Sequence, residues 1–346
     1  MRVAPLGDAA DRRNGPSTRA GRGALPAAPG RGGNRQGHPG LGEPGRWRRH
    51  RPGGAVRRPR AGVPAVLRRL PLNTRAPAGG AGDIAVRTRP GPGPAILWVH
   101  GYTLDAGVWG PLWDRLPDYA HVALDLPGHG ASTRPIARVA RLGDFSHAVA
   151  EVADAHGADI VLGLSFGATV ALQAALDRPA RYAALLLAAC GLAGGPQDRE
   201  AADCHLELAR LARERGIGPW LADRWLACPP RIFEAIRARP AAFAPVEAAV
   251  RRHAWTELTH EGMASMARDV QSPAAIARLD MPLSLLVGEH DMAAFKRSAH
   301  LISKAARHAN CGYAPLRGHL PLLESPDEGA VWVRAQLAAS RPGRKP

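Results

Sequence analysis

Short, continuous apolar runs recur along the chain, and amphipathic stretches of helical length separate them. A run of this kind predicts a strand that is covered on both faces of a sheet. Before the first run, residues 83–89 alternate between apolar and polar positions, as an outer strand does. The predicted buried strands are residues 95–99, 121–126, 159–162, 182–189 and 283–287, with a weaker run at 310–314.

Two of the intervening stretches, residues 145–156 and 166–176, have the apolar spacing of helices. Strands that alternate with helices predict an α/β domain with a mostly parallel central sheet flanked by helices. In such a sheet, functional residues gather at the carboxyl ends of the strands. The loops that follow the apolar runs are therefore the expected place of catalytic residues.

One interval, residues 191–272, breaks this rhythm because it contains no strand-like run. Prolines interrupt its helical periodicity, and it is too long to be a simple crossover between two strands. We predict an all-helical insertion, or lid, between two sheet strands. The predicted core is then residues 81–190 together with residues 273–342.

Residues 1–80 differ from the rest of the chain in composition. They contain 17 Arg, no Lys and three acidic residues, are rich in Gly, Pro and Ala, and have almost no aromatic or β-branched residues. Such a segment cannot bury enough apolar surface to offset its ordering entropy, so we predict a disordered tail. Three hypotheses explain the tail: a start codon assigned too early, a solubilising segment, or a nucleic-acid-binding arm.

The formal net charge of +16 is concentrated in this tail, because residues 81–346 carry 29 basic and 27 acidic residues. The predicted domain therefore offers no basic surplus to nucleic acid. The tail lacks the interleaved aromatic residues that stack on bases, so we do not expect a nucleic-acid partner. We expect a small-molecule substrate, and the sequence does not indicate an oligomeric state.

No stretch approaches the roughly 18 consecutive apolar residues of a membrane span, and the first residues lack the apolar run of a secretory signal. Four cysteines are widely spaced, without the C-x-x-C pair that indicates metal or redox work: Cys190, Cys204, Cys228 and Cys311. We expect the cysteines to be reduced, the protein to be cytoplasmic, and no membrane partner.

The strongest chemical signal is Gly163-Leu-Ser165-Phe-Gly167. A serine that attacks a carbonyl must stand out from the backbone on a tight turn, and glycine two residues away on either side relieves the crowding. The motif follows an apolar run and precedes a helical pattern, which is the strand–turn–helix setting that it requires. We predict that Ser165 is a nucleophile; the alternative is a glycine-rich turn with an incidental serine.

A serine hydroxyl needs an adjacent base. His319 follows the last apolar run, with Gly318 before it and Pro321 at the start of the next helix. We predict that His319 is the base. Three other histidines lie around the preceding helical pattern, where we expect surface or capping residues: His290, His300 and His308.

The imidazole in turn needs an acid that orients it. Asp291 ends the loop after the apolar run 283–287 and is the candidate. Glu289, two residues earlier, is its nearest rival. The alternative role for Asp291 is to cap the helix predicted at residues 293–306.

An oxyanion that forms during acyl transfer needs donors that are positioned in advance. The backbone N–H of Phe166, next to the serine, is one candidate. The second is the N–H of Tyr102, in the loop where Gly101 permits a close turn. We interpret His100 as a hydrogen-bonded structural residue and not as a catalyst.

The predicted lid carries large aromatic residues suited to an apolar or aromatic substrate, and those assigned to the pocket are Trp220, Trp225 and Trp255. It also carries arginines, of which Arg231 is the candidate to face inward and pair with a substrate carboxylate. The alternative is that the aromatic residues form the lid's own core and the arginines are solvated.

Five motifs occur in the order and spacing of the α/β-hydrolase superfamily: Trp98-Val-His-Gly-Tyr102, Asp125-Leu-Pro-Gly-His-Gly-Ala-Ser132, Gly163-Leu-Ser-Phe-Gly167, Gly288-Glu-His-Asp291 and Gly318-His319. Residues 83–340 resemble its lid-bearing branch, which includes small esterases, enol-lactonases, carbon–carbon bond hydrolases and related lyases. The resemblance implies an α/β-hydrolase fold and a structural turn at Asp125. Serine at the nucleophile position argues against the dehalogenase and epoxide-hydrolase branches, which need a carboxylate there.

The function predicted from these residues is hydrolysis of an ester or related acyl bond through an acyl-enzyme, by a serine–histidine–aspartate triad. We expect no cofactor and no metal, since Asp125 and His129 alone fall short of a ligand set. Carbon–carbon cleavage or elimination on the same triad is one alternative. A ligand-binding module without catalysis is another, although a complete triad argues against it.

Overall fold

The computed structural model describes residues 82–227, 231–260 and 262–340. All of them belong to the unit that spans Leu67–Pro346. The predicted tail, residues 1–80, lies outside the described residues.

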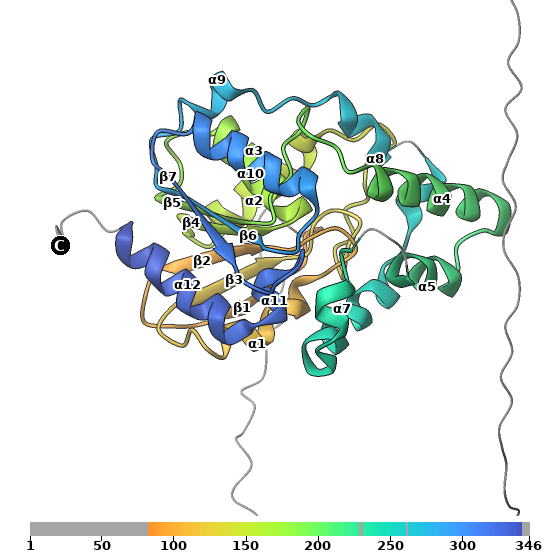
Figure 1. The fold of residues 1–346 in the computed structure, drawn as a ribbon, viewed down its shortest axis with the longest axis horizontal. Coiled ribbons are helices and arrows are strands. Elements are labelled where there is room, and N and C mark those ends of the chain that lie inside the picture. The colour runs from red at the N-terminus through yellow and green to blue at the C-terminus, as the bar shows by residue number, and fades with distance from the viewer. Residues whose placement is uncertain (1–81, 228–230, 261, 341–346) are drawn as a thin grey trace, which may run out of the picture. The chain divides into compact units, whose positions relative to one another are not determined.

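Seven strands form one sheet (Figure 1): β1 (Val86–Arg89), β2 (Ala95–Val99), β3 (Ala120–Leu124), β4 (Ile160–Leu164), β5 (Ala184–Ala188), β6 (Leu283–Gly288) and β7 (Ala309–Ala314). Their order across the sheet is β1-β3-β2-β4-β5-β6-β7. All neighbours are parallel except β1, which pairs antiparallel with β3 at one edge. The mostly parallel sheet and the outer position of the first strand confirm the predictions.

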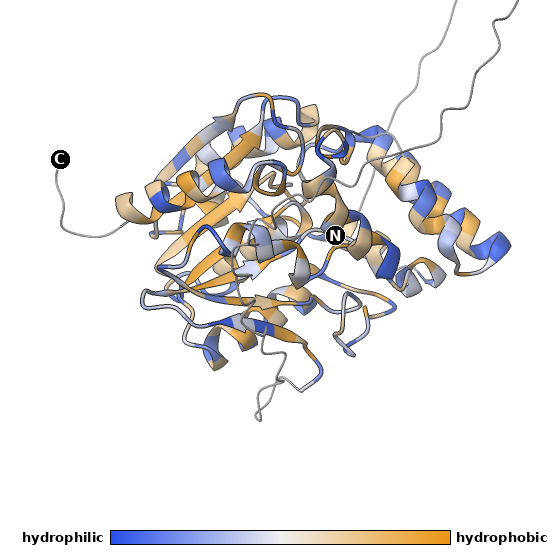
Figure 2. Cartoon of the chain, turned by 90° about the horizontal axis from the view of Figure 1, so that it is seen from below, coloured by the Kyte–Doolittle hydropathy of each residue, from blue (hydrophilic) through white to orange (hydrophobic). Residues whose placement is uncertain are grey.

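The three middle strands, β2, β4 and β5, contain only apolar residues and glycine, as expected where both faces of the sheet are covered. β4 directs Leu162 and Leu164 into one hydrophobic core and Val161 into the other, in keeping with the alternation of side chains along a strand. Figure 2 shows hydrophobic residues concentrated in the strands, while the surface helices carry both hydrophobic and hydrophilic residues. Continuous apolar runs are therefore the expected sequence of such strands.

Helices cover both faces of the sheet. The helices that pack on one face are α2 (Leu142–Ala155), α3 (Phe166–Asp177), α9 (Pro273–Ile276) and α10 (Ala293–Ala305). Those that pack on the other face are the 3-10 helix η1 (Ala106–Trp109), α1 (Gly110–Trp113), α11 (Pro321–Glu324) and α12 (Pro326–Ala339).

Between β5 and β6 the described residues form helices and no strand, as the sequence predicts for residues 191–272, which we call the helical segment. The helical segment contains α4 (Arg199–Arg215), α5 (Pro219–Ala227), α6 (Glu234–Arg237), α7 (Pro240–Arg252), η2 (Thr256–Thr259), α8 (Gly262–Ser265) and η3 (Met266–Arg268). Helix α9 begins directly after the helical segment. Figure 1 shows α4, α5 and α7 gathered at one end of the sheet.

The longest of the described helices, α4, has 17 residues. No helix in the described ranges is both long enough and apolar enough to cross a bilayer.

Candidate active site

Ser165 lies on the turn between β4 and α3, with a backbone φ of +55°. A side chain on Gly167 would place its Cβ 2.2 Å from the carbonyl oxygen of His100. A Cβ on Gly163 would lie 2.5 Å from the carbonyl oxygen of Gly167. Both glycines are therefore required for this turn, and the predicted strand–turn–helix setting of the serine is confirmed.

Three side chains far apart in the sequence form one hydrogen-bonded relay. Ser165 Oγ lies 2.8 Å from His319 Nε2, and His319 Nδ1 lies 2.8 Å from Asp291 Oδ1. A carboxylate only accepts, so the Nδ1–H donates to Asp291 and Nε2 is left to accept the proton of Ser165. The imidazole and the carboxylate are buried, whereas Ser165 borders a cavity.

The loop after β6 brings Asp291, and not Glu289, to the imidazole. Asp291 is 4% exposed, and its Oδ1 also accepts from the backbone N–H of Met292 at 2.7 Å. Glu289 is exposed, and its Oε2 accepts from the backbone N–H of Leu316 at 2.9 Å. The residue at the N-cap of α10 is Met292, so the alternative role of Asp291 as the cap is not what the structure has. His290, His300 and His308 are exposed, as predicted.

Sequence reasoning missed Glu324, which holds the loop that carries His319. Glu324 is 3% exposed, and its two carboxylate oxygens accept from the backbone N–H groups of Gly318 at 2.8 Å and Leu320 at 3.0 Å. These two residues flank His319, so one carboxylate fixes the backbone on both sides of the imidazole. The only sequence signal was a glutamate at the end of the otherwise apolar stretch Leu320-Pro-Leu-Leu-Glu324.

The loop after β2 approaches Ser165 closely. A Cβ added to Gly101 would lie 3.3 Å from the Cβ of Ser165. Among the described residues, neither the backbone N–H of Tyr102 nor that of Phe166 has a hydrogen-bond acceptor. Two unused amide donors therefore belong to residues that border the Ser165 hydroxyl.

His100 is fully buried and both of its ring nitrogens are engaged. Its Nε2 accepts from the backbone N–H of Leu126 at 3.0 Å, and its Nδ1–H donates to the carbonyl of Gly101 at 2.8 Å. Burial lowers the pKa of this imidazole and keeps it neutral. The structural role predicted for His100 agrees with these contacts.

Asp125 stabilises a turn. Its Oδ1 accepts from the backbone N–H of Ala106 at 2.7 Å, and its Oδ2 accepts from that of Ala131 at 2.8 Å. His129 Nδ1–H donates to the carbonyl of Pro127 at 2.9 Å. Within the described ranges, no group of three or more His, Cys, Asp or Glu side chains is arranged to hold a metal ion.

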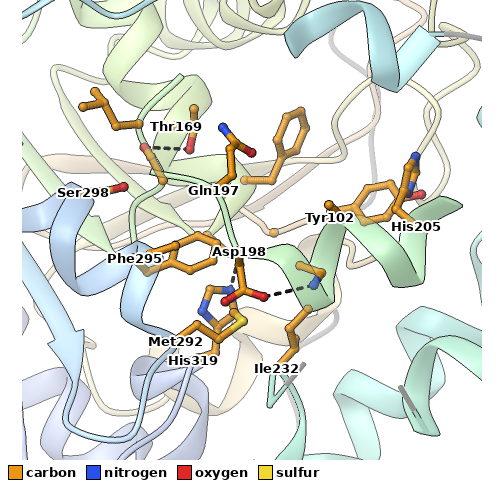
Figure 3. Close-up of a pocket in the computed structure, with 18 of the residues that line it drawn as sticks. Tyr102, Thr169, Gln197, Asp198, His205, Ile232, Met292, Phe295, Ser298 and His319 are labelled. Atoms are coloured by element: carbon orange, nitrogen blue, oxygen red, sulfur yellow. Dashed lines mark hydrogen bonds between the residues drawn. The ribbon is translucent and has the colours of Figure 1, made fainter. Parts of the chain in front are cut away.

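A cavity of about 390 Å³ borders Ser165 and His319 (Figure 3). Tyr102 and His205 lie on one side of it, and Phe295 and Ser298 on the other. The residues that the helical segment contributes to its lining include Pro196, Gln197, Asp198, His205, Trp225, Ile232, Phe233 and Met263.

Of the four residues predicted to line a pocket in the lid, only Trp225 does so. Trp255 is 2% exposed and packs edge-on against His253, with the ring centroids 4.8 Å apart. Trp220 packs against the same core and lies under Arg215, 4.7 Å from the guanidinium carbon to the ring centroid. The predictions for Trp220 and Trp255 are wrong because Trp255 is buried in the hydrophobic core and the partly buried Trp220 packs against it, and neither lines the cavity.

The prediction for Arg231 is also wrong. Its side chain is 71% exposed and pairs with Glu234 at 3.3 Å, outside the cavity. Arg251 pairs with Asp223, and Arg252 pairs with Asp105. No arginine or lysine of the described residues lines the cavity.

The cysteines depart in part from the prediction of four reduced thiols. Cys190, two residues after the end of β5, is free and buried, and burial raises its thiol pKa to about 12. Cys311, within β7, is also free. Cys204, on α4, is disulfide-bonded, so the expectation of a reduced thiol is wrong there. Cys228 lies outside the described residues.

A family model described as "Alpha/beta hydrolase family" matches residues 96–331, which is more than half of the chain. The chain belongs to the alpha/beta hydrolase family. It is an enzyme of that family, and the fold implied by the motif resemblance is confirmed.

The chain is similar to the following two sequence relatives and, in fold, to one solved structure. The chain is 30% identical to a pimeloyl-[acyl-carrier protein] methyl ester esterase of Xanthomonas campestris, over 72% of this chain and 97% of the relative. It is 29% identical to a 2-succinyl-6-hydroxy-2,4-cyclohexadiene-1-carboxylate synthase of an Enterobacter species, over 59% of this chain and 80% of the relative. A thermophilic esterase from Thermogutta terrifontis shares the fold, with a TM-score of 0.63, 24% identity and coverage of 78% of this chain and 97% of the esterase.

Proposed function

We propose that the protein cleaves an ester or related acyl bond, with Ser165 as nucleophile, His319 as base and Asp291 as the acid that orients the base. The observation that carries this proposal is the pair of 2.8 Å contacts that joins the serine hydroxyl to the imidazole and the imidazole to the carboxylate. Such a relay is useful where a hydroxyl must lose its proton at neutral pH.

The proposed cycle has two steps. Ser165 Oγ attacks the acyl carbon while His319 Nε2 takes the hydroxyl proton, and the negative charge of Asp291 stabilises the imidazolium. The imidazolium then protonates the leaving oxygen, so an alcohol departs and the acyl group stays on Oγ. Water attacks the acyl-enzyme with His319 again as base, and a carboxylic acid leaves while the Ser165 hydroxyl is restored. These steps need no cofactor.

We assign the oxyanion donors to the backbone N–H groups of Tyr102 and Phe166. The close approach of Gly101 to Ser165 and the absence of another acceptor for either amide among the described residues support this assignment. A donor of this kind contributes about 2.7–4 kcal/mol to the stabilisation of the transition state.

The cavity favours a small, neutral and largely apolar acyl or alcohol group. Its lining is mostly apolar, and in the described part of the chain Asp198 is the one carboxylate among the lining residues, with no arginine or lysine. An anionic substrate would therefore meet a like charge and no counter-ion. This argues for a neutral ester and against a carboxylated substrate.

The substrate charge is testable with two p-nitrophenyl esters of equal length, one methyl-terminated and one carboxyl-terminated. We expect the neutral ester to have the higher kcat/KM, by about tenfold or more. The substitution Asp198→Asn should narrow the ratio by a few-fold, because it removes the like charge. A higher kcat/KM for the carboxylated ester would contradict the assignment.

The catalytic proposal is tested with p-nitrophenyl acetate, p-nitrophenyl butyrate and a fluorophosphonate probe. The wild-type protein should hydrolyse the esters and be labelled at Ser165. The substitution Ser165→Ala should remove labelling and lower kcat by at least about 10⁴-fold. Persistent turnover in that variant would overturn the assignment, and so would the absence of both activities in the wild type.

A carbon–carbon hydrolase or lyase is the second candidate, because one relative is named as a carboxylate synthase and not as an esterase. In that case the fluorophosphonate probe would label Ser165, but the esters would not turn over. The lack of an arginine or lysine in the described lining, which leaves a carboxylated substrate without a counter-ion, favours the esterase.

A further inference from the structure

A buried polar cluster behind the proposed oxyanion loop takes no part in the relay. Tyr102 Oη donates to Glu257 Oε1 at 2.6 Å, and His253 Nε2–H donates to the same oxygen at 3.0 Å. His253 and Glu257 are buried, and Glu257 lies on η2 of the helical segment. The contact therefore joins the loop after β2 to a residue 155 positions further along the chain.

The protonation states of this cluster suit a fixed contact. Burial alone would raise the pKa of Glu257, but hydrogen bonds from His253 and Tyr102 outweigh burial and hold the pKa below its usual value. Burial, and then the negative charge of Glu257, raise the pKa of Tyr102 well above its usual value. The phenol therefore stays protonated, and its O–H donates a charge-assisted hydrogen bond to the Glu257 carboxylate.

A second contact from the helical segment holds the next residue of the same loop. Trp225 Nε1–H donates to Thr103 Oγ1 at 2.9 Å, and that hydroxyl donates to the carbonyl of Tyr102 at 2.7 Å. Thr103 has a φ of +63°, a left-handed conformation that a β-branched residue adopts only where its surroundings impose it. The helical segment thus supports a strained stretch of backbone next to Tyr102.

We propose that Glu257 and Trp225 are positioning residues. They hold the loop 101–104 so that the backbone N–H of Tyr102 stays directed at the oxyanion. The proposal rests on the proposed function, because it gives the Tyr102 amide a role in catalysis. The Tyr102 hydroxyl points to Glu257, so its removal leaves the ring in place beside the cavity. The helical segment then influences the rate of reaction as well as the choice of substrate.

The geometric argument is the narrow range within which an oxyanion donor works. A donor must lie about 2.7–3.1 Å from the oxyanion, and a small misplacement costs much of its effect. The loop's own backbone hydrogen bond, from Leu104 N–H to the carbonyl of Gly101 at 3.1 Å, closes the turn without fixing where the turn lies. Glu257 and Trp225 supply the contacts that anchor it from outside.

The test compares four single substitutions. Tyr102→Phe removes the hydroxyl and keeps the ring. Glu257→Leu removes the acceptor, whereas Glu257→Gln retains an acceptor oxygen for both donors. Tyr182→Phe is the matched control, because Tyr182 is 4% exposed and its hydroxyl has no partner among the described residues.

Four quantities are measured for each variant: kcat and KM with p-nitrophenyl butyrate, the inhibition constant of a trifluoromethyl ketone that forms a tetrahedral adduct, and hydrogen exchange of the loop 101–104. For Tyr102→Phe and Glu257→Leu we expect kcat to fall by at least about 10-fold. The upper limit is the loss of about 10²–10³-fold that removal of one oxyanion donor causes. KM should stay within about twofold, inhibitor affinity should fall in parallel with kcat, and the loop should exchange faster. Glu257→Gln should restore most of kcat, and Tyr182→Phe should match the wild type.

The proposal is overturned if folded Tyr102→Phe keeps the wild-type kcat and loop exchange, or if only KM changes. If Glu257→Leu does not fold, Tyr102→Phe decides by itself. Hydrogen exchange needs no substrate, so it tests the anchoring even if the proposed function fails. Failure of the proposed function would appear differently: ester turnover would persist when Ser165→Ala is added to the wild type or to any of these variants.

Discussion

In the α/β core, the side chains of the relay come from the loops that follow β4, β6 and β7, at the carboxyl ends of these strands. The helical segment reaches the same cavity from α4, from α5 and from the residues before α6. The core places its groups through the backbone: tight turns, glycines and peptide hydrogen bonds. The helical segment places its groups through side-chain packing between short helices.

This difference explains why one region was predictable and the other was not. Ser165 must follow a strand and precede a helix, so its place can be recognised from neighbouring residues. Trp225 and Trp220 are five residues apart on α5, yet one lines the cavity and the other does not. Which face of a short helix meets the cavity depends on partners distant in the sequence.

The largest expected effect tests the core. Asp291→Asn should lower kcat by about 10⁴-fold, because an amide donor facing Nδ1 favours the wrong tautomer of His319. Glu289→Gln, two residues away in the same loop, should stay within about twofold. The measurement is kcat with p-nitrophenyl butyrate for both variants. Equal losses would remove the distinction between the two acids.

The next effect concerns the turn that carries Ser165. Gly167→Ala should destabilise the fold by about 1–3 kcal/mol, because the new Cβ overlaps the backbone after β2. Gly143→Ala is the control: nothing lies within 4 Å of its Cβ, and alanine favours a helix such as α2 by up to about 1 kcal/mol. Urea unfolding midpoints measure both. A Gly167→Ala variant as stable as the wild type would show that the turn tolerates a side chain.

A smaller effect should follow from loosening the loop around His319. Glu324→Gln replaces one accepting oxygen with an NH₂ group that cannot accept from a backbone N–H. Leaving a buried amide unpaired costs about 1–3 kcal/mol, and if His319 shifts with its loop, kcat should fall by about tenfold. Glu328→Gln, an exposed substitution on α12, should have little effect. If the two variants have the same kcat, Glu324 does not position the imidazole.

The smallest effect tests the helical segment. Arg231→Ala should leave kcat/KM within about twofold for neutral and carboxylated esters alike, since a largely exposed pair contributes little. A fall in kcat/KM for the carboxylated ester alone would support the hypothesis that Arg231 faces inward and pairs with a substrate carboxylate, against what the structure indicates. Kinetics with the same two esters used for Asp198 provide the answer.

The sequence by itself determined the sheet, the helical insertion and the candidate members of the relay. Parallel strands need continuous apolar runs, and a nucleophile on a tight turn needs glycines at fixed spacing, so these features are encoded by residues close together in the chain. His319 and Asp291 could be named because each follows a predicted strand.

The tertiary structure decided what depends on contacts between distant residues. It brought Asp291 and not Glu289 to His319, placed Glu324 against the loop that carries His319, and joined Tyr102 to Glu257. It also turned Arg231 to solvent and excluded arginine and lysine from the described lining of the cavity. The physical reason is the same throughout: a long side chain takes its direction from whichever partner packing brings within hydrogen-bonding distance, and no local pattern records that partner.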